Sequence, residues 1–525
     1  MPERKQFRAI KGTRDILPPD SALWNWFEQT ARDVFESYNF GEIRLPIFED
    51  TELFARSIGS DTDVVAKEMY TFVDHSMDDL EWMRRHIVLR RPEHDDQAAV
   101  RLLLAEVKVV LAEANAGLLS GEMPKSPENM RALQQLELYS TMINPEILPA
   151  GPGISQFNLA VIQIQQAAAA LRLGDVVSLR PEATASVCRA YIEHNLHALP
   201  GNAKLYYIGP MFRRERPQKG RYRQFYQIGA EVLGASDAPA IDAELLEMLL
   251  VFFHRVGLRR TTLYINSIGD KNCRPAYVEL LRAELQKVKD RLGPDSQRRI
   301  ETNPLRVLDS KIPEEQPIIE KLPRISGHLC EACRAHFAKL KDELHLRGIQ
   351  YEENWRLVRG LDYYTRTTFE VTAAGLGSQN AVCGGGRYDG LVELLGGPLT
   401  KGIGFAIGTD RSILSIEEGG NAPKLAGLAV YVAWMGPAAY PAAVRITRKL
   451  REAGLTVELP PEEMKFKKSL GLADKLGARY ALIIGEDEVA SASYTLKNLA
   501  DAEQRKLSEN DLLEYLESER RGTRA

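Results

Sequence analysis

Residues 204–234 read KLYYIGPMFRRERPQKGRYRQFYQIGAEVLG, and they form the strongest structural signal in the chain. Two runs rich in aromatic and β-branched residues flank a Pro-Gln-Lys-Gly turn, which predicts an antiparallel hairpin. The turn region carries a single acid, Glu215, among the cations Arg213, Arg214, Arg216, Lys219, Arg221 and Arg223. Because side chains alternate along a strand, some of these arginines would share one face, where guanidinium groups suit a polyphosphate. A solvated basic hairpin is the alternative.

A second polar strand pattern spans residues 357–370, LVRGLDYYTRTTFE. It combines Arg359 with Asp362, Arg366 and two adjacent tyrosines, Tyr363 and Tyr364. Tyrosine rings pack while their hydroxyls form hydrogen bonds, so an arginine beside them indicates a pocket for a polar ligand. A strand with ordinary core tyrosines is the alternative.

Two glycine-rich stretches follow, CGGGRYDGLVELLGG at 383–397 and GIGFAIGTDR at 402–411. Glycine lets the backbone approach a ligand closely, and Arg411 falls in the first turns of a predicted helix. Neither stretch has the spacing of a dinucleotide fingerprint, and the chain contains no G-x-x-x-x-G-K-[ST] sequence. The pattern therefore excludes a P-loop nucleotide hydrolase.

Two isolated acids lie beside or within apolar strand patterns, Glu182 in LRPEAT and Glu231 in IGAEVLG. A buried carboxylate without a partner is costly in free energy, so each acid requires a cation or a hydrogen-bond donor. A cationic group of a ligand and a neighbouring arginine are the two candidate partners.

The segment HLCEACRAH places a CxxC pair between two histidines, which is a possible metal pattern: His328, Cys330, Cys333 and His336. It lacks a second, distant pair of ligands of the kind that structural zinc sites use. The sequence therefore predicts packing here and no metal site.

The composition is that of a globular protein with several domains: 525 residues, 44% hydrophobic, 27% charged and a formal charge of −4. Any contact with nucleic acid must therefore come from local basic patches. Five cysteines do not make a disulfide framework, residues 1–10 lack an apolar leader, and charges interrupt the apolar stretch at 100–119. We expect a cytoplasmic protein without membrane contact.

The quoted segments together resemble the class II aminoacyl-tRNA synthetases, and among them the histidyl-tRNA synthetase family. The hairpin resembles the family's motif 2, residues 402–411 its motif 3, and residues 356–370 and 384–391 its two histidine-binding segments. Further similarity lies in KGTRDILP, GEIRLPIFEDTELFARSIG and DVVAKEMYTF, at residues 11–18, 41–59 and 63–72.

The resemblance implies an α+β fold, with an antiparallel class II sheet flanked by helices, a helical insertion and a C-terminal α/β anticodon-binding domain. Within the insertion, periodicity predicts helices near 95–118, 128–140 and 155–173. The implied divisions are a first part of the catalytic core at 1–76, an insertion of unassigned role at 77–175, a second part of the core at 176–424 with a mostly helical segment at 270–345, and an anticodon-binding domain at 425–525.

The resemblance also implies residue roles toward ATP and its Mg²⁺. Arg213 and Arg359 would be the catalytic residues and would contact the α-phosphate from two sides. Glu215 would lie by the adenine, and Arg221 and Arg411 would lie toward the terminal phosphates.

For L-histidine, the resemblance implies that Glu182, Thr184 and Gln227 hold the amino group. Glu231, Tyr364 and Tyr388 would recognise the imidazole ring. Tyr363 and Arg359 would belong to the same histidine-binding site.

The implied activity is formation of histidyl-adenylate and pyrophosphate from histidine and ATP, followed by transfer of histidine to the 3′ end of the tRNA for histidine. The family implies a homodimer with an interface around Pro46. In the C-terminal domain, Lys465, Lys467 and Lys468 beside Phe466 are candidate tRNA contacts. A solvated helix start is the alternative for this run.

The sequence departs from the family pattern at Thr409 and Asp410, where motif 3 usually carries Leu or Ile and then Glu. Ala183 stands where glycine is common, and Tyr226 where histidine is common. Two alternative functions are the synthetase-like regulatory subunit of ATP phosphoribosyltransferase and an ATP-dependent ligase for histidine-like substrates without tRNA. The retained arginines and the C-terminal domain favour the synthetase.

Overall fold

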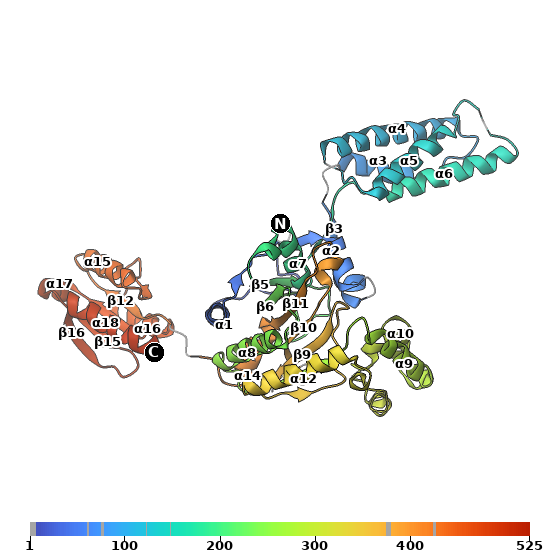
Figure 1. The fold of residues 1–525 in the computed structure, drawn as a ribbon. Coiled ribbons are helices and arrows are strands. Elements are labelled where there is room, and N and C mark those ends of the chain that lie inside the picture. The colour runs from blue at the N-terminus through green and yellow to red at the C-terminus, as the bar shows by residue number, and fades with distance from the viewer. Residues whose placement is uncertain are drawn as a thin grey trace. The chain divides into compact units, whose positions relative to one another are not determined.

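The computed structural model describes residues 7–59, 62–74, 78–121, 123–147, 149–373, 380–423 and 427–524. The chain forms two compact units, one running to Ala422 and the other starting at Pro423 (Figure 1). Each unit is described by itself below.

The first unit is built on an eight-stranded sheet in the order β1-β5-β6-β11-β10-β9-β7-β8. Neighbouring strands are antiparallel except at the two edges, where β1 pairs with β5 and β7 with β8 in parallel. The predicted α+β class with an antiparallel core is therefore confirmed. The strands are β1 (Gly41–Glu42), β5 (Ala203–Phe212), β6 (Gln224–Gly234), β7 (Thr261–Ser267), β8 (Glu352–Glu353), β9 (Thr365–Ala373), β10 (Ala381–Arg387) and β11 (Lys401–Gly408).

This strand order brings the sequence motifs together although they are far apart in the chain. β5 and β6 form the predicted hairpin, and β11 lies beside β6 with Gly404 opposite Glu231. β10 pairs with both β11 and β9, so Gly384 lies opposite Ala406 on one side and Glu370 on the other. The middle of the sheet is thus shared by all the polar motifs.

Aromatic side chains hold helices α1 (Asp20–Ser37) and α8 (Pro239–Arg255) against the sheet. Phe35 of α1 packs edge-on against Tyr206 of β5, Phe252 of α8 and Phe405 of β11. The residue after Tyr206, Tyr207, points to the opposite face, as strand alternation requires. One face of the sheet is therefore buried by helices and the other carries the cavity described below.

A separate three-stranded antiparallel sheet contains β2 (Phe48–Asp50), β4 (Val176–Leu179) and β3 (Tyr70–Val73), in that order. The chain leaves this sheet after β3 and returns at β4, where Val73 pairs with Val176 and the Asp74 amide donates to the Asp175 carbonyl. The two ends of the insertion are therefore adjacent, as expected for an insertion at a hairpin tip.

The insertion contains α3 (Asp78–Leu89), α4 (Gln97–Ser120), α5 (Pro127–Thr141) and α6 (Pro152–Ala170). Its apolar side chains form a core of their own, drawn from residues 80–173. Three of these helices match the predicted stretches, but α3 was not predicted. Exposed Trp82 and Leu89 interrupt the apolar stripe of α3, which is why its sequence pattern is weak.

The remaining helices of the first unit are α2 (Thr51–Ile58), the π-helix η1 (Val64–Glu68), α7 (Thr184–Glu193), α9 (Arg274–Gln286), α10 (Pro294–Thr302), α11 (Gln316–Ile319), α12 (Glu331–Leu346), α13 (Leu391–Leu394) and α14 (Thr409–Glu418). Short 3-10 turns lie at Leu196–Ala198, Lys289–Arg291, Pro304–Val307, Pro313–Glu315 and Ile325–Gly327. The strand pattern over residues 357–370 is wrong in its first half, because β9 starts only at Thr365.

The second unit has a five-stranded sheet in the order β13-β12-β14-β15-β16. Its strands are β12 (Val430–Trp434), β13 (Val457–Glu458), β14 (Tyr480–Ile484), β15 (Ser493–Asn498) and β16 (Gln504–Ser508), and its helices are α15 (Ala439–Glu452), α16 (Phe466–Lys475), α17 (Glu486–Ser491) and α18 (Glu509–Arg524). The alternating strands and helices match the sequence expectation, whereas the antiparallel hairpin of β15 and β16 was not predicted.

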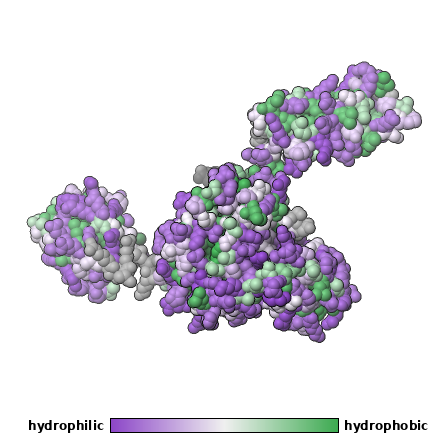
Figure 2. All heavy atoms as spheres, viewed as in Figure 1, coloured by the Kyte–Doolittle hydropathy of each residue, from purple (hydrophilic) through white to green (hydrophobic). Residues whose placement is uncertain are grey.

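The surface view is largely hydrophilic, with apolar residues interspersed among polar ones (Figure 2). None of the helices that the structure describes is both long and apolar enough to span a bilayer.

Candidate active site

A cavity of about 310 Å³ opens on the sheet face opposite α1. All but one of the residues predicted to bind ATP or histidine line it: Glu182, Thr184, Arg213, Glu215, Arg221, Gln227, Arg359, Tyr363, Tyr364, Tyr388 and Arg411. They come from the hairpin, from the segment before β9, from the loop after β10 and from the starts of α7 and α14. Segments more than a hundred residues apart thus meet in one polar pocket.

Arg213 and Arg359 line this same cavity from separate parts of the chain. Arg213 leaves the end of β5, donates from Nε to the Pro181 carbonyl at 2.9 Å, and lies 5.4 Å from the Phe225 ring centroid. Arg359 precedes β9, and its Nη1 lies 3.0 Å from a carboxylate oxygen of Glu370. Both guanidinium groups are therefore held in place by protein contacts.

The cavity brings several arginines close to one another on its phosphate side, with Glu215 among them. Glu215 forms an ion pair with Arg221, and one of its oxygens lies 3.8 Å from Nη1 of Arg213. Burial, followed by the positive charge of Arg221, lowers the pKa of Arg411. A polyanion in the cavity would relieve this repulsion between neighbouring cations.

Two polar atoms of the cavity residues are buried without a hydrogen-bond partner among the described residues. They are Nε of Arg359 and Oε1 of Gln227. Buried polar groups in folded proteins are nearly always paired, so an unpaired donor and acceptor in one cavity indicate a ligand that would satisfy them.

Glycines in β10 and β11 make room for the functional side chains. A Cβ atom at Gly384 would clash with the Arg359 guanidinium, and one at Gly404 would clash with the Glu231 carboxylate. A Cβ atom at Gly402 would likewise clash with the Tyr388 ring. The glycines thus admit side chains of the protein itself, which is a different use from the close backbone approach to a ligand that the sequence suggested.

Glu182 caps the N-terminus of α7. Its Oε2 accepts from the amide of Thr184 at 2.7 Å and its Oε1 accepts from the amide of Ala185 at 3.0 Å. The Tyr363 hydroxyl also donates to it at 3.4 Å. Burial raises the pKa of Glu182, while the two amides act in the opposite direction.

Glu231 lies behind the cavity wall and is absent from the cavity lining. Its two oxygens accept hydrogen bonds from the Thr184 hydroxyl and the Tyr388 hydroxyl, each at 2.7 Å. Burial raises the pKa of Glu231 to about 8. The structure therefore connects Glu231 to the cavity through two hydroxyl groups that line it.

Three tyrosines form one wall of the cavity. The Tyr363 ring lies 4.7 Å from the Tyr364 ring and 5.9 Å from the Tyr388 ring, measured between centroids. This wall offers flat apolar surfaces with hydroxyl groups at their edges, which is suited to a small aromatic ligand bearing ring nitrogens.

Comparison with known proteins agrees with this geometry. The family model described as histidyl-tRNA synthetase matches residues 165–411, and an anticodon binding domain model matches residues 429–519. A histidine–tRNA ligase of Koribacter versatilis is 45% identical over 97% of this chain and 96% of its own length. Another, from Solibacter usitatus, is 44% identical over 97% and 99%.

The chain belongs to the histidyl-tRNA synthetase family. The crystal structure of apo histidyl-tRNA synthetase from S. aureus is similar over 98% of this chain and 100% of its own, with a TM-score of 0.67 and 30% identity. Members of the family are ATP-dependent ligases that join histidine to tRNA, and this chain is one of them. These matches favour the ligase over the regulatory subunit and over a ligase without tRNA.

The departures from the histidyl-tRNA synthetase pattern are accommodated by packing. Asp410 accepts from Nη2 of Arg14 at 2.9 Å and from the Tyr226 amide at 3.0 Å, which links the N-terminal segment to the sheet. Tyr226 packs edge-on against Trp24, and Ala183 is fully buried. The hydroxyl of Thr409 is buried without a hydrogen-bond partner in the described part of the chain.

Several cavity residues were missed from the sequence. Glu370, Tyr207 and Cys383 also line the cavity of this synthetase. Glu370 ends the segment 357–370. The alternation of side chains along this strand is the one sequence signal that could have indicated on which face of the sheet Glu370 lies. No sequence signal marked Tyr207 or Cys383 as a cavity residue. Tyr207 follows another tyrosine in β5, and Cys383 lies among small and apolar residues in β10.

The candidate tRNA contacts of the synthetase are exposed in the second unit. Lys465 precedes α16, and Lys467 and Lys468 lie in its first turn. Phe466 beside them is 41% exposed. A helix N-terminus with nearby lysines is favourable for a phosphate group.

The histidines of the HLCEACRAH segment do not approach its cysteines as metal ligands. His336 has its Nε2 at 3.0 Å from the Asp237 carbonyl, and exposed His328 lies against the Tyr277 ring. Cys330 and Cys333 instead lie beside two residues from another part of the chain, considered further below.

Proposed function

We propose that the cavity binds ATP and L-histidine together and forms histidyl-adenylate with release of pyrophosphate. One observation carries this proposal: Arg213 and Arg359, from different segments, line a single cavity whose other wall holds the tyrosines and Glu182. The second step would be attack of the terminal adenosine hydroxyl of the tRNA for histidine on the same adenylate.

In the first step, a carboxylate oxygen of histidine attacks the α-phosphorus of ATP and the bond to pyrophosphate breaks. Negative charge grows on the phosphoryl oxygens during this exchange. Arg213 and Arg359 would stabilise it without moving, because both are already fixed by protein contacts. Positioning and electrostatics supply the catalysis, and no covalent enzyme intermediate is required.

The remaining groups of the ATP side have distinct roles in this proposal. Arg221 and Arg411 would bind the terminal phosphates, and Glu215 would hold Arg221 and contact the adenine. Mg²⁺ would enter on the phosphates and neutralise part of their charge. Glu370, which lines the cavity, would provide the hard carboxylate oxygens that Mg²⁺ prefers.

On the histidine side, Glu182, Thr184 and Gln227 would hold the amino group. Tyr364 and Tyr388 would bind the imidazole, with Tyr363 packed between them, and Glu231 would fix the hydroxyl of Tyr388. An apolar analogue would leave these polar groups unpaired, so it would be rejected in the transition state.

We also propose that residues 425–525 bind the anticodon of the tRNA, as the matched domain model supports. Lys465, Lys467 and Lys468 would contact its phosphates. The catalytic core would then comprise 1–76 and 176–424, with the insertion at 77–175 left unassigned.

A homodimer formed around Pro46 is part of the proposal. Apolar side chains are exposed next to Pro46 and on β3, the other edge strand of the three-stranded sheet: Ile47, Phe48, Phe72 and Val73. Exposed apolar groups concentrated on a small sheet mark a protein contact. We propose that the dimer works in the cytoplasm, where tRNA is charged.

Histidine-dependent ATP–pyrophosphate exchange with the purified protein tests the proposed function. Exchange should require histidine and fail with other amino acids. Arg359→Ala should reduce it sharply, and exchange at the wild-type rate in that variant would remove Arg359 from the mechanism. A protein that binds histidine but shows no exchange at all would instead be a regulatory module.

A further inference from the structure

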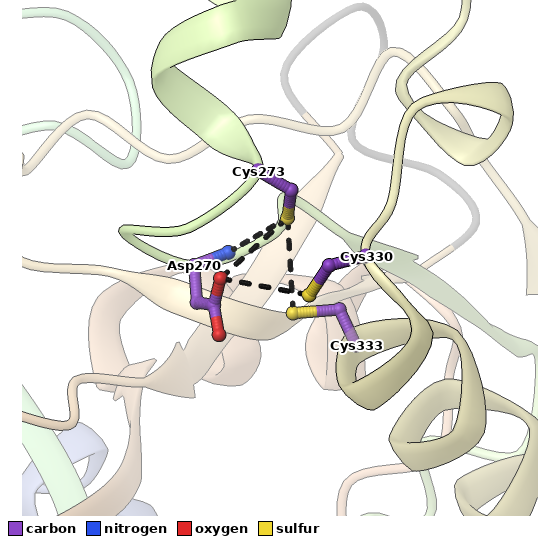
Figure 3. A group of neighbouring side chains, drawn as sticks. All are labelled: Asp270, Cys273, Cys330 and Cys333. Carbon is purple, nitrogen blue, oxygen red and sulfur yellow. Dashed lines mark hydrogen bonds between the residues drawn. The ribbon is translucent and has the colours of Figure 1, made fainter.

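Four potential metal ligands from two distant segments converge near the base of β9 (Figure 3). Asp270 follows β7, Cys273 immediately precedes α9, and Cys330 and Cys333 lie at the start of α12. Their ligand atoms all lie within 4.8 Å of one another. Among the residues that the structure describes, no other group of three or more histidines, cysteines or acids is arranged in this way.

The distances between these atoms fit a single tetrahedral ion. Sγ of Cys273 lies 3.8 Å from Sγ of Cys333. Oδ1 of Asp270 lies 3.6 Å from Sγ of Cys273 and 3.8 Å from Sγ of Cys330. An ion about 2.3 Å from each sulfur and about 2.1 Å from the oxygen requires edges of about 3.6–3.8 Å. These three distances therefore already match the edges of one coordination shell, and all four ligand atoms lie within 4.8 Å of one another.

Two of the cysteines lie at the starts of helices. Cys273 and Cys330 occupy the N-cap positions of α9 and α12, and the positive end of a helix dipole is favourable for a ligand set with net negative charge. The amide of Asp270 also donates toward Sγ of Cys273, at 3.4 Å. Two helix starts thus point at the same small volume.

Arg366 provides the outer charge that such a site needs. Its Nη2 lies 3.7 Å from Oδ2 of Asp270, and its Nη1 contacts Asp237 at 2.6 Å. Arg366 has a φ of 51°, a left-handed conformation that costs energy for a residue other than glycine. The Arg366 amide donates to the Gly269 carbonyl at 2.7 Å. Arg366 therefore ties β9 to the Asp270 loop through both its backbone and its side chain.

We propose that Asp270, Cys273, Cys330 and Cys333 bind one structural zinc ion. Three thiolates with one carboxylate at tetrahedral spacing are a donor set for Zn²⁺, and a closed set of four protein ligands is typical of a structural rather than a catalytic site. Binding converts each thiol to a thiolate and releases its proton to solvent, with no change of oxidation state. Arg366 offsets part of the negative charge that remains.

The zinc would connect the helical segment 270–345 to the histidine side of the cavity. It would join the start of that segment to the start of α12, because its ligands lie at residues 270 and 273 and at residues 330 and 333. Arg274, which follows a ligand, donates from Nη1 to the Tyr364 carbonyl at 2.5 Å. Tyr364 also shares a buried apolar cluster with Cys273 and Cys333. The site would therefore brace Tyr364 from behind.

The other possible state of these cysteines is a disulfide. The sulfurs of Cys273 and Cys333 are 3.8 Å apart, much longer than a disulfide bond of about 2.05 Å. A CxxC pair could still oxidise, so the experiment must count thiols as well as metal.

Metal analysis of the full-length protein, purified under reducing conditions without chelators, tests the proposal. We expect about one zinc per chain, retained on gel filtration. Replacement by Co²⁺ should give the strong near-ultraviolet charge-transfer band of thiolate ligands and visible bands of tetrahedral geometry. A thiol reagent should modify the three ligand cysteines only after a chelator has removed the metal.

Variants sharpen the test. Cys330→Ser and Asp270→Asn should lose most of the zinc, whereas the matched control His328→Ala, in the same segment, should keep it. Cys188→Ser, a buried cysteine outside the cluster, should also keep it. If the ligand variants do not fold, Co²⁺ titration and thiol protection in the wild-type protein still show whether the cysteines bind the metal.

Less than about a tenth of an equivalent of any metal before and after reconstitution would overturn the proposal. So would a disulfide between Cys330 and Cys333 in protein kept under reducing conditions, or equal zinc loss in His328→Ala and Cys330→Ser. Removal of zinc should raise the KM for histidine more than the KM for ATP. This last measurement concerns the bracing of Tyr364 and rests on the proposed function, whereas the zinc content, the Co²⁺ spectrum and the thiol protection test the metal site without any activity.

Discussion

The guanidinium group of Arg359 lies so close to Gly384 of β10 that a Cβ atom at residue 384 would overlap it. Arg359 can therefore lie over the sheet only while its neighbour has no side chain. The same group is held at 3.0 Å by Glu370, whose own strand position is opposite Gly384. One glycine thus sets the position of one catalytic candidate.

Gly384→Ala should displace Arg359 and lower the rate of histidine-dependent pyrophosphate exchange by about a hundredfold, the loss typical of removing one fixed charge-stabilising group. The Gly41→Ala variant is the matched control, because Gly41 lies in β1 of the same sheet and an added Cβ there meets nothing within 4 Å. Unchanged exchange in Gly384→Ala, with folding verified by circular dichroism, would contradict the proposed role of Arg359.

Glu231→Gln should change how stability depends on pH. Burial raises the pKa of Glu231 to about 8 from an ordinary value of 4.5, so the folded protein retains a proton that the unfolded chain releases. Wild-type stability therefore falls as pH rises between these two values and the contribution is constant above them. Relative to wild type, the variant should gain at most about 1.4 kcal/mol of unfolding free energy per pH unit in this window.

Urea unfolding of both proteins at several pH values between about 5 and about 8 measures this difference. A difference that stays constant with pH would show that Glu231 is ionised in the folded protein throughout. Tyr388→Phe is a useful companion variant, because it removes one of the two hydrogen bonds to Glu231 and should raise the pKa of that carboxyl further.

Asp242→Asn should strongly destabilise the first unit. Asp242 accepts from Nε of Arg387 at 2.9 Å and from the Thr367 hydroxyl at 2.8 Å, and both charged side chains are fully buried. Removing one partner leaves a buried charge less well compensated, which typically costs about 3–5 kcal/mol. Glu146→Gln breaks the exposed pair with Arg101 and should cost less than about 1 kcal/mol. Similar shifts in the two variants, measured by thermal and urea unfolding, would contradict this difference.

Replacing residues 75–174 by Asn-Gly should leave histidine-dependent exchange measurable. The two strands that bound the insertion already pair as a hairpin, and Asn-Gly is the preferred two-residue turn for one. The insertion also has its own apolar core, so its removal exposes little of the catalytic unit. Complete loss of exchange in a folded variant would show that the insertion shapes the cavity.

Deleting residues 427–525 should impair tRNA charging far more than pyrophosphate exchange. The cavity is lined by residues 182–411 alone, whereas the candidate anticodon contacts lie in the second unit. Charging and exchange measured on the same preparation check this separation. Equal loss of both activities would contradict the division of labour between the units.

The convergence of the arginines could be predicted from the sequence because each lies in a recognisable segment of a known family. The position of Glu231 behind the cavity wall could not be predicted, because strand alternation gives the face on which a side chain lies but not what covers it. The irregular backbone before β9 has a physical reason. Tyr363 and Tyr364 both line the cavity, and adjacent residues of a regular strand cannot point to the same face.

The cysteine cluster shows a second limit of sequence patterns. Cys330 and Cys333 were visible as a pair, but Asp270 and Cys273 lie 60 residues earlier. Only the tertiary fold brings the start of α9 next to the start of α12, and the intervening segment gives no periodic signal for that approach. Neighbouring histidines were misleading because they are close in sequence and point elsewhere.

The pairing of β3 with β4 has a consequence for engineering this enzyme. The chain leaves and re-enters the catalytic unit through two adjacent paired strands. Another domain can therefore be inserted there, provided that its own N- and C-termini lie close together. Exchanging the helical bundle for a fluorescent protein or a ligand-responsive domain should therefore yield a synthetase whose aminoacylation can be followed or regulated through the inserted domain.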